Sequence, residues 1–280
     1  MNEQLQLKVN RAIKLIRSAV GGGIVELCYS GGKDSDVILE LTKMAGVNYR
    51  AIYKCTTLDP IGTIKHATEK GVEIVRPKRT FLQIVEKEGM PTRRCRHCCK
   101  YLKEYKILDT SIQGIRRCES SKRKNNYSED NPIICRIYGR SKKNHVNVIL
   151  PILSWTNKDV EDFITERGIK CHPLYYDENG RFHVERRLGC VGCPLQGDNG
   201  RGDYRSHPKL FRQVVKRVLK WWDTHPNAKS RSKFGSPYAL IAHNLFYNKY
   251  EDFAVADNNP FEGQRDWKQS LEEYFNITLD

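Results

Sequence analysis

Apolar residues in the first 90 positions of the chain follow two alternating spacings. Residues 3–18 place them on one helical face, and the run Gly21-Gly22-Gly23 ends that stretch. The short apolar runs that follow, predicted to be strands, are 24–29, 49–53 and 72–75, and the predicted helices between and after them are 36–45, 59–71 and 80–88. This alternation predicts an α/β fold with a doubly wound, mainly parallel sheet, in which ligands bind at the carboxyl ends of the strands.

The second half of the chain is patterned less regularly. A strand is predicted at 146–150, and helices are predicted at 157–167, 209–222 and 237–247. The acidic end of the chain is expected to form a helix and a tail.

Two segments are expected to be irregular. One is residues 116–145, with a mobile loop at 120–126, and the other is the Gly-, Pro- and Cys-rich stretch 170–206, which is expected to depend on a ligand. We therefore expect a nucleotide-binding domain with a cysteine module in residues 1–197, and a basic helical extension with an acidic tail in residues 198–280.

The composition is that of a globular protein. Of 280 residues, 39% are hydrophobic and 29% are charged, which allows a sizeable core and excludes a disordered chain. No apolar run is long enough to span a bilayer, and residues 1–20 lack the compact apolar segment of a signal peptide. We expect a cytoplasmic protein with no membrane partner, whose ten cysteines serve metal or thiol chemistry rather than disulfides.

Positive charge is concentrated in two segments of a chain whose net charge is +15. Residues 93–144 hold 15 Lys or Arg against 5 Asp or Glu, and residues 201–233 hold 10 against 2, whereas residues 251–280 hold 2 against 8. This asymmetry favours an anionic partner, which is either a nucleotide or a nucleic acid such as DNA or RNA. Solvated basic faces explain it equally well.

A polar turn, Ser30-Gly31-Gly32-Lys33-Asp34-Ser35, lies between the first predicted strand and the helix after it. A turn in this position aims backbone N–H groups at an anion, and its glycines let phosphate oxygens approach the main chain. Ser30 and Ser35 add hydroxyls and Lys33 adds a point charge. Asp34 suits an anion site only if it binds a cation such as Mg²⁺ or caps the helix. A glycine turn with a polar cap is the simpler alternative.

A second candidate nucleotide contact follows the second predicted strand. Thr56, Thr57 and Asp59 lie there, at the sheet edge where ligands bind in such folds, and could reach adenine or ribose. A plain strand-to-helix turn with Asp59 as its cap explains the same residues equally well.

Five cysteines form two clusters, Cys95, Cys98 and Cys99 in one and Cys190 and Cys193 in the other. Cys95-x₂-Cys98 with Cys190-x₂-Cys193 would make a tetrahedral zinc site. Cys98-Cys99 with the same downstream pair would instead ligate an iron–sulfur cluster. Ordinary buried or redox thiols are a third interpretation, and spacing alone leaves these alternatives open.

The polar turn resembles the PP-loop of the adenine-nucleotide α-hydrolase superfamily, which includes ATP pyrophosphatases, tRNA thiolases and sulfonucleotide reductases. That resemblance implies a Rossmann-like sheet of the HUP type, and a loop that holds the pyrophosphate of ATP or the anionic end of a phosphosulfate nucleotide. The stretch from Gly114 to Arg123 looks like the family's arginine-rich nucleotide segment. It implies that Gly114, Arg116 and Arg123 contact the nucleotide.

The cysteines resemble a family pattern as well. A vicinal Cys-Cys pair followed far downstream by Gly-Cys-x₂-Cys is similar to the [4Fe–4S] set of assimilatory adenylyl-sulfate reductases, in the phosphoadenosine phosphosulfate (PAPS) reductase family. Residues 150–169 and 172–176 resemble further blocks of that family, so the likeness spans residues 20–197. It implies a [4Fe–4S] cluster rather than Zn²⁺ on Cys98, Cys99, Cys190 and Cys193, with Cys95 left as a spare or exchanging thiol.

The chain departs from the reductases in its C-terminal part. Those enzymes attack the sulfonyl sulfur with a thiolate near a mobile C-terminus, but here no cysteine follows Cys193, and Pro194 stands where they carry Thr. Cys118 or Cys95 would have to supply the nucleophile. The resemblance therefore favours the iron–sulfur branch that adenylates or thiolates nucleic acid, such as the ATP pyrophosphatases of DNA phosphorothioation.

Three functions remain as hypotheses. The favoured one is an enzyme that binds ATP with Mg²⁺ and cleaves it at the α-phosphate, to adenylate or thiolate a nucleic acid or sulfur carrier. Lys33, Asp34, Arg116 and Arg123 would then serve catalysis, and a sulfur donor would be a partner. The second is a sulfonucleotide reductase that acts on adenylyl sulfate or PAPS with a non-standard cysteine and a thioredoxin-like reductant. The third is a non-catalytic nucleic-acid binder.

Overall fold

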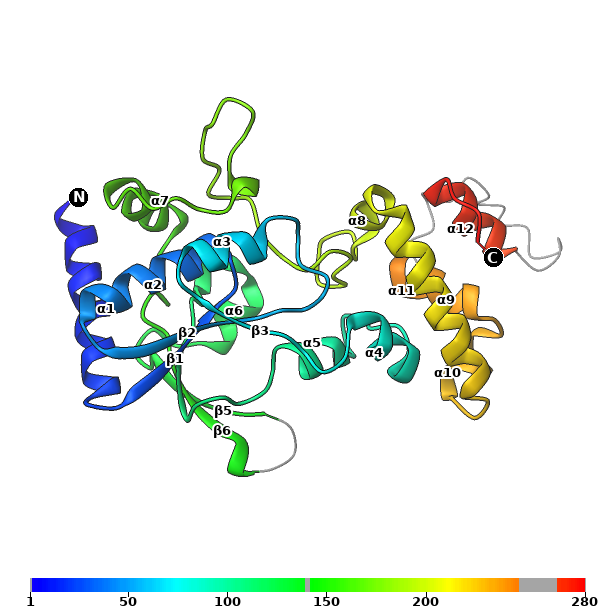
Figure 1. Cartoon of the computed structure of the whole chain (residues 1–280), viewed down its shortest axis with the longest axis horizontal. Coiled ribbons are helices and arrows are strands. Elements are labelled where there is room, and N and C mark those ends of the chain that lie inside the picture. The colour runs from blue at the N-terminus through cyan, green and yellow to red at the C-terminus, as the bar shows by residue number, and fades with distance from the viewer. Residues whose placement is uncertain (1, 139–141, 247–265, 280) are drawn as a thin grey trace. The chain divides into compact units, whose positions relative to one another are not determined.

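Six strands form one sheet in the order β3-β2-β1-β4-β6-β5 (Figure 1). They are β1 Ile24–Tyr29, β2 Asn48–Lys54, β3 Glu73–Val75, β4 Thr110–Ile112, β5 Ile133–Ile137 and β6 His145–Ile149. The pairings of β1 with β2 and β4, of β2 with β3, and of β4 with β6 are parallel, and β5 pairs with β6 antiparallel. The strand order reverses between β1 and β4, so the predicted doubly wound, mainly parallel sheet is confirmed.

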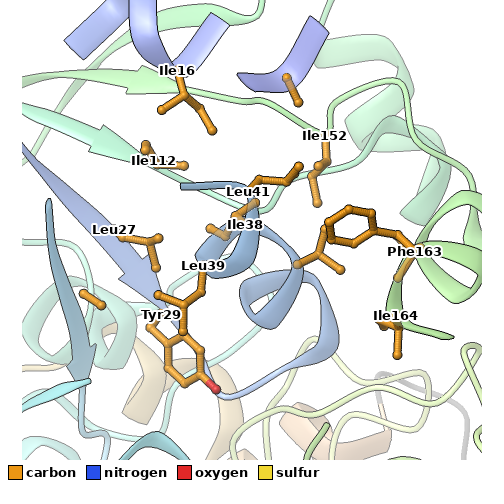
Figure 2. Packing of buried hydrophobic residues seen from close by; sticks show 14 of the residues in the cluster. Ile16, Leu27, Tyr29, Ile38, Leu39, Leu41, Ile112, Ile152, Phe163 and Ile164 are labelled. Atoms are coloured by element: carbon orange, nitrogen blue, oxygen red, sulfur yellow. The ribbon is translucent and has the colours of Figure 1, made fainter. Parts of the chain in front are cut away.

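The helices of the sheet unit are α1 Glu3–Val20, α2 Lys33–Ala45, α3 Thr63–Glu69, α6 Ser121–Asn126 and α7 Asn157–Glu166. They have buried residues in every case except α6, which has none. Figure 2 shows how Ile16 of α1, Leu27 of β1, Ile38 and Leu41 of α2 and Phe163 of α7 share one apolar core. All five are fully buried, so this core fixes α2, and with it the turn that precedes α2.

A second core is built mainly from helices. Its elements are α4 Phe81–Glu88, α5 His97–Leu102, α8 Arg201–Ser206, α9 Pro208–Thr224, α10 Lys229–Phe234, α11 Pro237–Phe246 and α12 Trp267–Phe275. Ile84 of α4 packs there with Val214 of α9, Ile241 of α11 and Leu271 of α12. None of the helices in the described part of the chain is both long and apolar enough to cross a membrane.

The chain alternates between the units that hold these two cores. The computed structural model describes residues 2–138, 142–246 and 266–279. The sheet unit comprises residues 1–55, 59–77 and 103–189, and the helical unit comprises residues 56–58, 78–102 and 190–280. The domain limits expected from the sequence, 1–197 and 198–280, are continuous stretches, whereas each unit here is made of three separate segments. Those limits stay a prediction.

Several elements differ from expectation. Residues 120–126, expected to be a mobile loop, form α6, because the Ser120 hydroxyl accepts the Arg123 N–H at 3.2 Å and caps the helix. Residues 133–137 form β5 within a stretch expected to be irregular; the strand lies at the sheet edge and is half exposed, so it lacks a buried apolar run. The helix expected from residue 59 begins at Thr63, and the helix expected to end at 247 is described to Phe246, residue 247 lying outside the described residues.

Candidate functional site

The polar turn lies where it was expected, at the carboxyl end of β1 and the start of α2. Gly31 has φ 78° and Gly32 is the N-cap of α2. Within the turn the Ser35 hydroxyl donates to the Gly32 carbonyl at 2.6 Å, and the Ser30 hydroxyl donates to the Ser35 oxygen at 3.3 Å. The turn is therefore pre-shaped by its own serines, at the helix end that favours anions.

The two glycines of the turn are closely packed from opposite directions. A Cβ on Gly31 would lie 2.7 Å from Cγ2 of Thr63 on α3, and a Cβ on Gly32 would lie 3.2 Å from the Tyr175 hydroxyl. Gly31 also has a backbone conformation that side chains rarely adopt. Gly31 thus requires glycine, whereas a side chain at Gly32 would fit only if the Tyr175 hydroxyl moved aside by a few tenths of an ångström.

Lys33 is buried in the first turn of α2, with 4% of its surface exposed. Its ammonium lies 3.3 Å from Oδ2 of Asp34, 3.5 Å from the Arg186 carbonyl oxygen and 5.3 Å from the centre of the Tyr175 ring. Burial lowers the pKa of Lys33, and the Asp34 carboxylate counteracts this shift. A bound anion at the turn would act in the same sense as Asp34 and stabilise the charged ammonium.

Asp34 is held by Arg116, which is itself only 1% exposed. The Arg116 Nε donates to Oδ1 of Asp34 at 2.6 Å, and its Nη1 donates to the Asn157 side chain at 3.0 Å. A Cβ on Gly114 would lie 2.9 Å from the Asp34 carbonyl oxygen, so this glycine lets the arginine-rich segment approach the turn. The structure therefore brings Gly114 and Arg116 to the turn.

The expectations for Asp34 need correcting in part. Gly32 is the N-cap of α2 and no side chain bonds at the cap, so Asp34 does not cap the helix. Its two carboxylate oxygens face Arg116 and Lys33, and the cation that Asp34 was expected to need is supplied by the protein. A Mg²⁺ ion would accordingly be held mainly by a nucleotide's own phosphates.

Arg123 reaches the turn's surroundings through Glu119 rather than directly. It forms an ion pair with Glu119, which also accepts the Arg116 backbone N–H at 3.1 Å and lies 3.9 Å from Arg187. Burial lowers the pKa of Arg123, and the neighbouring charge of Arg187 adds to the effect. Glu119 thus lies close to three arginines, and two of them, Arg116 and Arg123, were assigned to the nucleotide from the sequence.

Thr56, Thr57 and Asp59 do not form one group. Asp59 belongs to the sheet unit, where its carboxylate accepts from the Cys55 thiol at 3.2 Å. The other two belong to the helical unit: Thr57, with φ 61°, accepts the Phe81 N–H at 2.9 Å, and Thr56 accepts from the Cys190 thiol at 3.5 Å. Their proposed contact with adenine or ribose stays a prediction.

The four candidate metal ligands all belong to the helical unit. Arg93 joins the two segments that carry them, because it donates to the carbonyl oxygens of Pro194 at 3.0 Å and Gln196 at 2.5 Å. A hydrogen bond with Cys99, then burial and the nearby Cys190, raise the pKa of the Cys98 thiol. Burial is the main cause that raises the pKa of Tyr204, and Cys98 and Cys193 raise it further.

These thiols are neighbours but do not form a finished site. Within the ranges that the structure describes, no three or more Cys, His, Asp or Glu side chains are arranged to hold a metal ion. The donor set itself, four cysteines with Arg96 Nη1 at 4.0 Å from the Cys99 sulfur, has the chemistry of a thiolate-bound cluster with a cationic surround. Cys95 lies apart from it, exposed and 3.7 Å from Nδ1 of His97.

One protein-family model matches the part of the chain that contains both the turn and the cysteines. The model of the phosphoadenosine phosphosulfate reductase domain matches residues 24–196. The chain belongs to this family. The matched region contains the PP-loop, the arginine-rich segment and both cysteine clusters, so the resemblance found in the sequence is confirmed.

Three solved structures resemble the chain at low sequence identity. An FMN adenylyltransferase from Candida glabrata is 16% identical with a TM-score of 0.45, over 68% of this chain and 62% of that one. A PAPS reductase from Candida auris is 15% identical (TM-score 0.42; 68% and 96% covered). The U34-tRNA thiolase NcsA from Methanococcus maripaludis, with its [4Fe–4S] cluster, is 17% identical (TM-score 0.42; 80% and 82%). No curated protein matches the sequence.

Four residues around the PP-loop of this family member were missed as site residues. From the sequence, His66 and His172 are interpreted as structural because they show no ligand spacing, Asp36 is assigned no role, and Tyr175 is only part of a family-like block. Asp36 accepts from the Tyr29 hydroxyl at 2.6 Å and lies 3.1 Å from Nε2 of His66. Asp36, His66 and His172 are all buried, and burial cannot be assigned to a lone histidine from sequence.

Proposed function

We propose that this PAPS reductase family member binds ATP on its PP-loop and cleaves it between the α- and β-phosphates, transferring AMP or activating a target for sulfur transfer. The observation that carries the proposal is the setting of Lys33. Its buried ammonium lies beside Asp34 at the N-terminus of α2, within a turn in which Gly31 leaves no room for a side chain. Such a turn suits a pyrophosphate group, whose negative charge would balance the positive charge of Lys33.

The residues of the PP-loop would divide the work of this reaction. Backbone N–H groups at Gly31 and Gly32 and the Lys33 ammonium would bind the β,γ-pyrophosphate. A target oxygen would attack the α-phosphorus, and the bond to the bridging oxygen would break to release pyrophosphate. Arg116 would hold the loop through Asp34, 2.6 Å away, while Arg123 and Arg187 on Glu119 supply positive charge.

The cysteines suit a [4Fe–4S] cluster on Cys98, Cys99, Cys190 and Cys193, with Zn²⁺ on the same module as the alternative. Arg93 already links the segments that carry the two pairs. Such a cluster, when bound, would hold the module together or pass sulfur from a donor to the activated target. The partners that fit are ATP with Mg²⁺, a sulfur donor, and a DNA or RNA target suited to the net charge of +15.

The experiment that tests this function is a product assay on anaerobically purified protein. ATP labelled at the α-phosphate is incubated with Mg²⁺, a sulfide donor and either plasmid DNA or total tRNA. We expect AMP or an adenylated target with an equal amount of pyrophosphate, and brown protein with about four irons per chain. ADP with phosphate would contradict cleavage at the α-phosphate, and colourless protein with one zinc would contradict the cluster.

A second function, reduction of adenylyl sulfate or PAPS, is favoured by the position of Cys118. Its exposed thiol accepts from Nη1 of Arg116 at 3.0 Å, and the same guanidinium binds Asp34 of the PP-loop. The thiolate would attack the sulfonyl sulfur, expel the nucleotide and form a thiosulfonate, from which a dithiol reductant would release sulfite. Sulfite release that needs thioredoxin and is lost in Cys118→Ser but kept in Cys95→Ser would establish this function.

A further inference from the structure

The imidazole of His172 is buried in the sheet unit, 1% exposed, and has no part in the reaction proposed above. Its Nδ1 accepts the Leu174 N–H at 3.2 Å and so caps the 3-10 turn Pro173–Tyr175. Its Nε2 lies 3.4 Å from Oγ1 of Thr63, the first residue of α3. One ring therefore connects two segments that are more than 100 residues apart in sequence.

These contacts specify one protonation state. Because Nδ1 accepts a hydrogen bond, it carries no proton. The Thr63 hydroxyl donates to the Pro60 carbonyl oxygen at 2.8 Å, so its oxygen is left to accept from Nε2–H of the ring. The imidazole is thus neutral, with its proton on Nε2. Burial, and secondly the nearby His66, lower the pKa of His172.

Thr63 and the turn that His172 caps both lie next to the PP-loop. Cγ2 of Thr63 would lie 2.7 Å from a Cβ on Gly31, and the hydroxyl of Tyr175, in the turn that His172 caps, 3.2 Å from a Cβ on Gly32. The Tyr175 ring also lies 5.3 Å from the Lys33 ammonium. His172 therefore fixes one neighbour of each glycine in the loop.

The titratable groups around the ring belong to one buried network. The His66 ring packs edge-on at 5.7 Å, and its Nε2 binds the Asp36 carboxylate, which also accepts from Tyr29. Burial and then Asp36 raise the pKa of the Cys171 thiol, whereas Lys70 and Lys33 lower it. The Asp36 carboxylate is already hydrogen-bonded to His66 and Tyr29, so its charge near His172 is shared with two other groups.

We propose that His172 is a positioning residue for the nucleotide, and that its neutral imidazole holds Thr63 and Tyr175 against Gly31 and Gly32 in the shape that binds pyrophosphate. The inference rests on the proposed binding of a nucleotide to the PP-loop. Adding a proton to Nδ1 removes the acceptor for the Leu174 N–H and releases the turn that carries Tyr175. Nucleotide affinity therefore falls as the pH falls through the pKa of His172, which lies below the ordinary value of 6.5.

Two substitutions separate the two bonds of the ring. His172→Asn keeps an acceptor at the Nδ1 position and caps the turn, but does not reach Thr63. His172→Gln reaches Thr63 with an amide donor and loses the cap. The affinities for ATP and for inorganic pyrophosphate are measured from pH 5 to 8, with His145→Asn, an exposed histidine on β6, as the control.

We expect both variants to bind ATP and pyrophosphate about tenfold more weakly at pH 8 and to lose the decline at acid pH that wild type shows. Amide hydrogen exchange of ligand-free protein should accelerate at Leu174 in His172→Gln but not in His172→Asn. Variants that match wild type in affinity and pH profile, or unchanged exchange at Leu174 in His172→Gln, would overturn the role of His172. Wild-type protein that binds neither ligand would instead refute the proposed function, and this inference with it.

Discussion

Lys33 combines two properties that conflict unless an anion is bound nearby. It is 4% exposed, and burial lowers its pKa, yet its nearest carboxylate, Asp34, is already bonded to Arg116. A protein that only needed to fill this space would gain by using an apolar side chain, because a buried charge without a full partner is costly. The ammonium is therefore best explained by the ligand that the PP-loop is proposed to bind.

Replacing Lys33 by Met should abolish function without unfolding the protein. The substitution keeps the length of the side chain and its packing on Tyr175, but removes the charge that would face the pyrophosphate. We expect AMP formation to fall about 100-fold or more, with the thermal midpoint unchanged or raised. Lys65→Met, at a side chain that is 82% exposed, should leave both quantities at wild-type values.

Gly114 offers a test of how the arginine-rich segment meets the PP-loop. In Gly114→Ala the new Cβ would lie 2.9 Å from the Asp34 carbonyl oxygen, and backbone atoms must move to accept it. We expect a loss of about 1–3 kcal/mol in the free energy of unfolding together with weaker ATP binding.

The matched control is Gly22→Ala, where nothing lies within 4 Å of the new Cβ. Its unfolding free energy, measured by urea titration, should stay within about 0.5 kcal/mol of wild type. A Gly114→Ala protein that behaves like this control would show that the segment can move away from Asp34 at no cost.

At the scale of elements, the structure departs from the sequence prediction where an element is short or lies at an edge. The strands β1 and β2 are six and seven residues long and contain buried apolar runs, which make them predictable from the sequence. β4 has one apolar residue in three, whereas β3, which is equally short and is predicted from the sequence, has two that follow Val72. β5 alternates half-buried with exposed positions and lacks a buried apolar run. α6 has no apolar face from which a helix could be predicted, and its N-cap, Ser120, is the local sign of it.

The cap of α4 shows how local such information is. The Thr80 hydroxyl accepts the Gln83 N–H at 3.3 Å, and the Gln83 side chain accepts the Thr80 N–H at 2.8 Å. Thr80→Ala should lower the unfolding free energy of the protein by about 1 kcal/mol, whereas Thr80→Ser, which keeps the hydroxyl, should cost much less. Denaturant unfolding measures both, and an equal loss in the two variants would exclude the cap as the cause.

For the molecule as a whole, the net charge of +15 makes salt the most direct probe of a nucleic-acid partner. We expect the affinity for duplex DNA or tRNA to fall steeply as salt rises, since each phosphate contact releases counterions. Reversing the exposed Lys122 and Lys124 of α6 to Glu should reduce the slope of log affinity against log salt by about one for each lysine that contacts a phosphate.

Lys14→Glu, an exposed lysine on α1, serves as the control and should keep the wild-type slope. Binding that does not depend on salt, or equal slopes in all three proteins, would remove α6 from any nucleic-acid surface. Loss of DNA binding with ATP turnover intact would separate the target surface from the PP-loop.

How much of the site could be predicted follows from how far apart its parts lie in the sequence. The PP-loop is six consecutive residues, of which all but Asp34 suit an anion, so it is visible in the sequence alone. Gly114 and Arg116 came from family resemblance, since nothing local says that Arg116 reaches Asp34. The link from His172 to Thr63 spans 109 positions, and no spacing rule brings those two side chains together.

The interleaving of the two units has a consequence for how the protein is made. The apolar face of α4, with Phe81, Ile84 and Val85, packs with residues of α9, which begins about 120 residues later in the chain. At ribosomal rates of about 5–20 residues per second, α4 emerges on the order of ten seconds before its partner and must wait with that face uncovered. A fragment that stops at residue 197 would never cover it, so we expect such a fragment to require a chaperone or to aggregate, even though it contains every cysteine and the whole nucleotide loop.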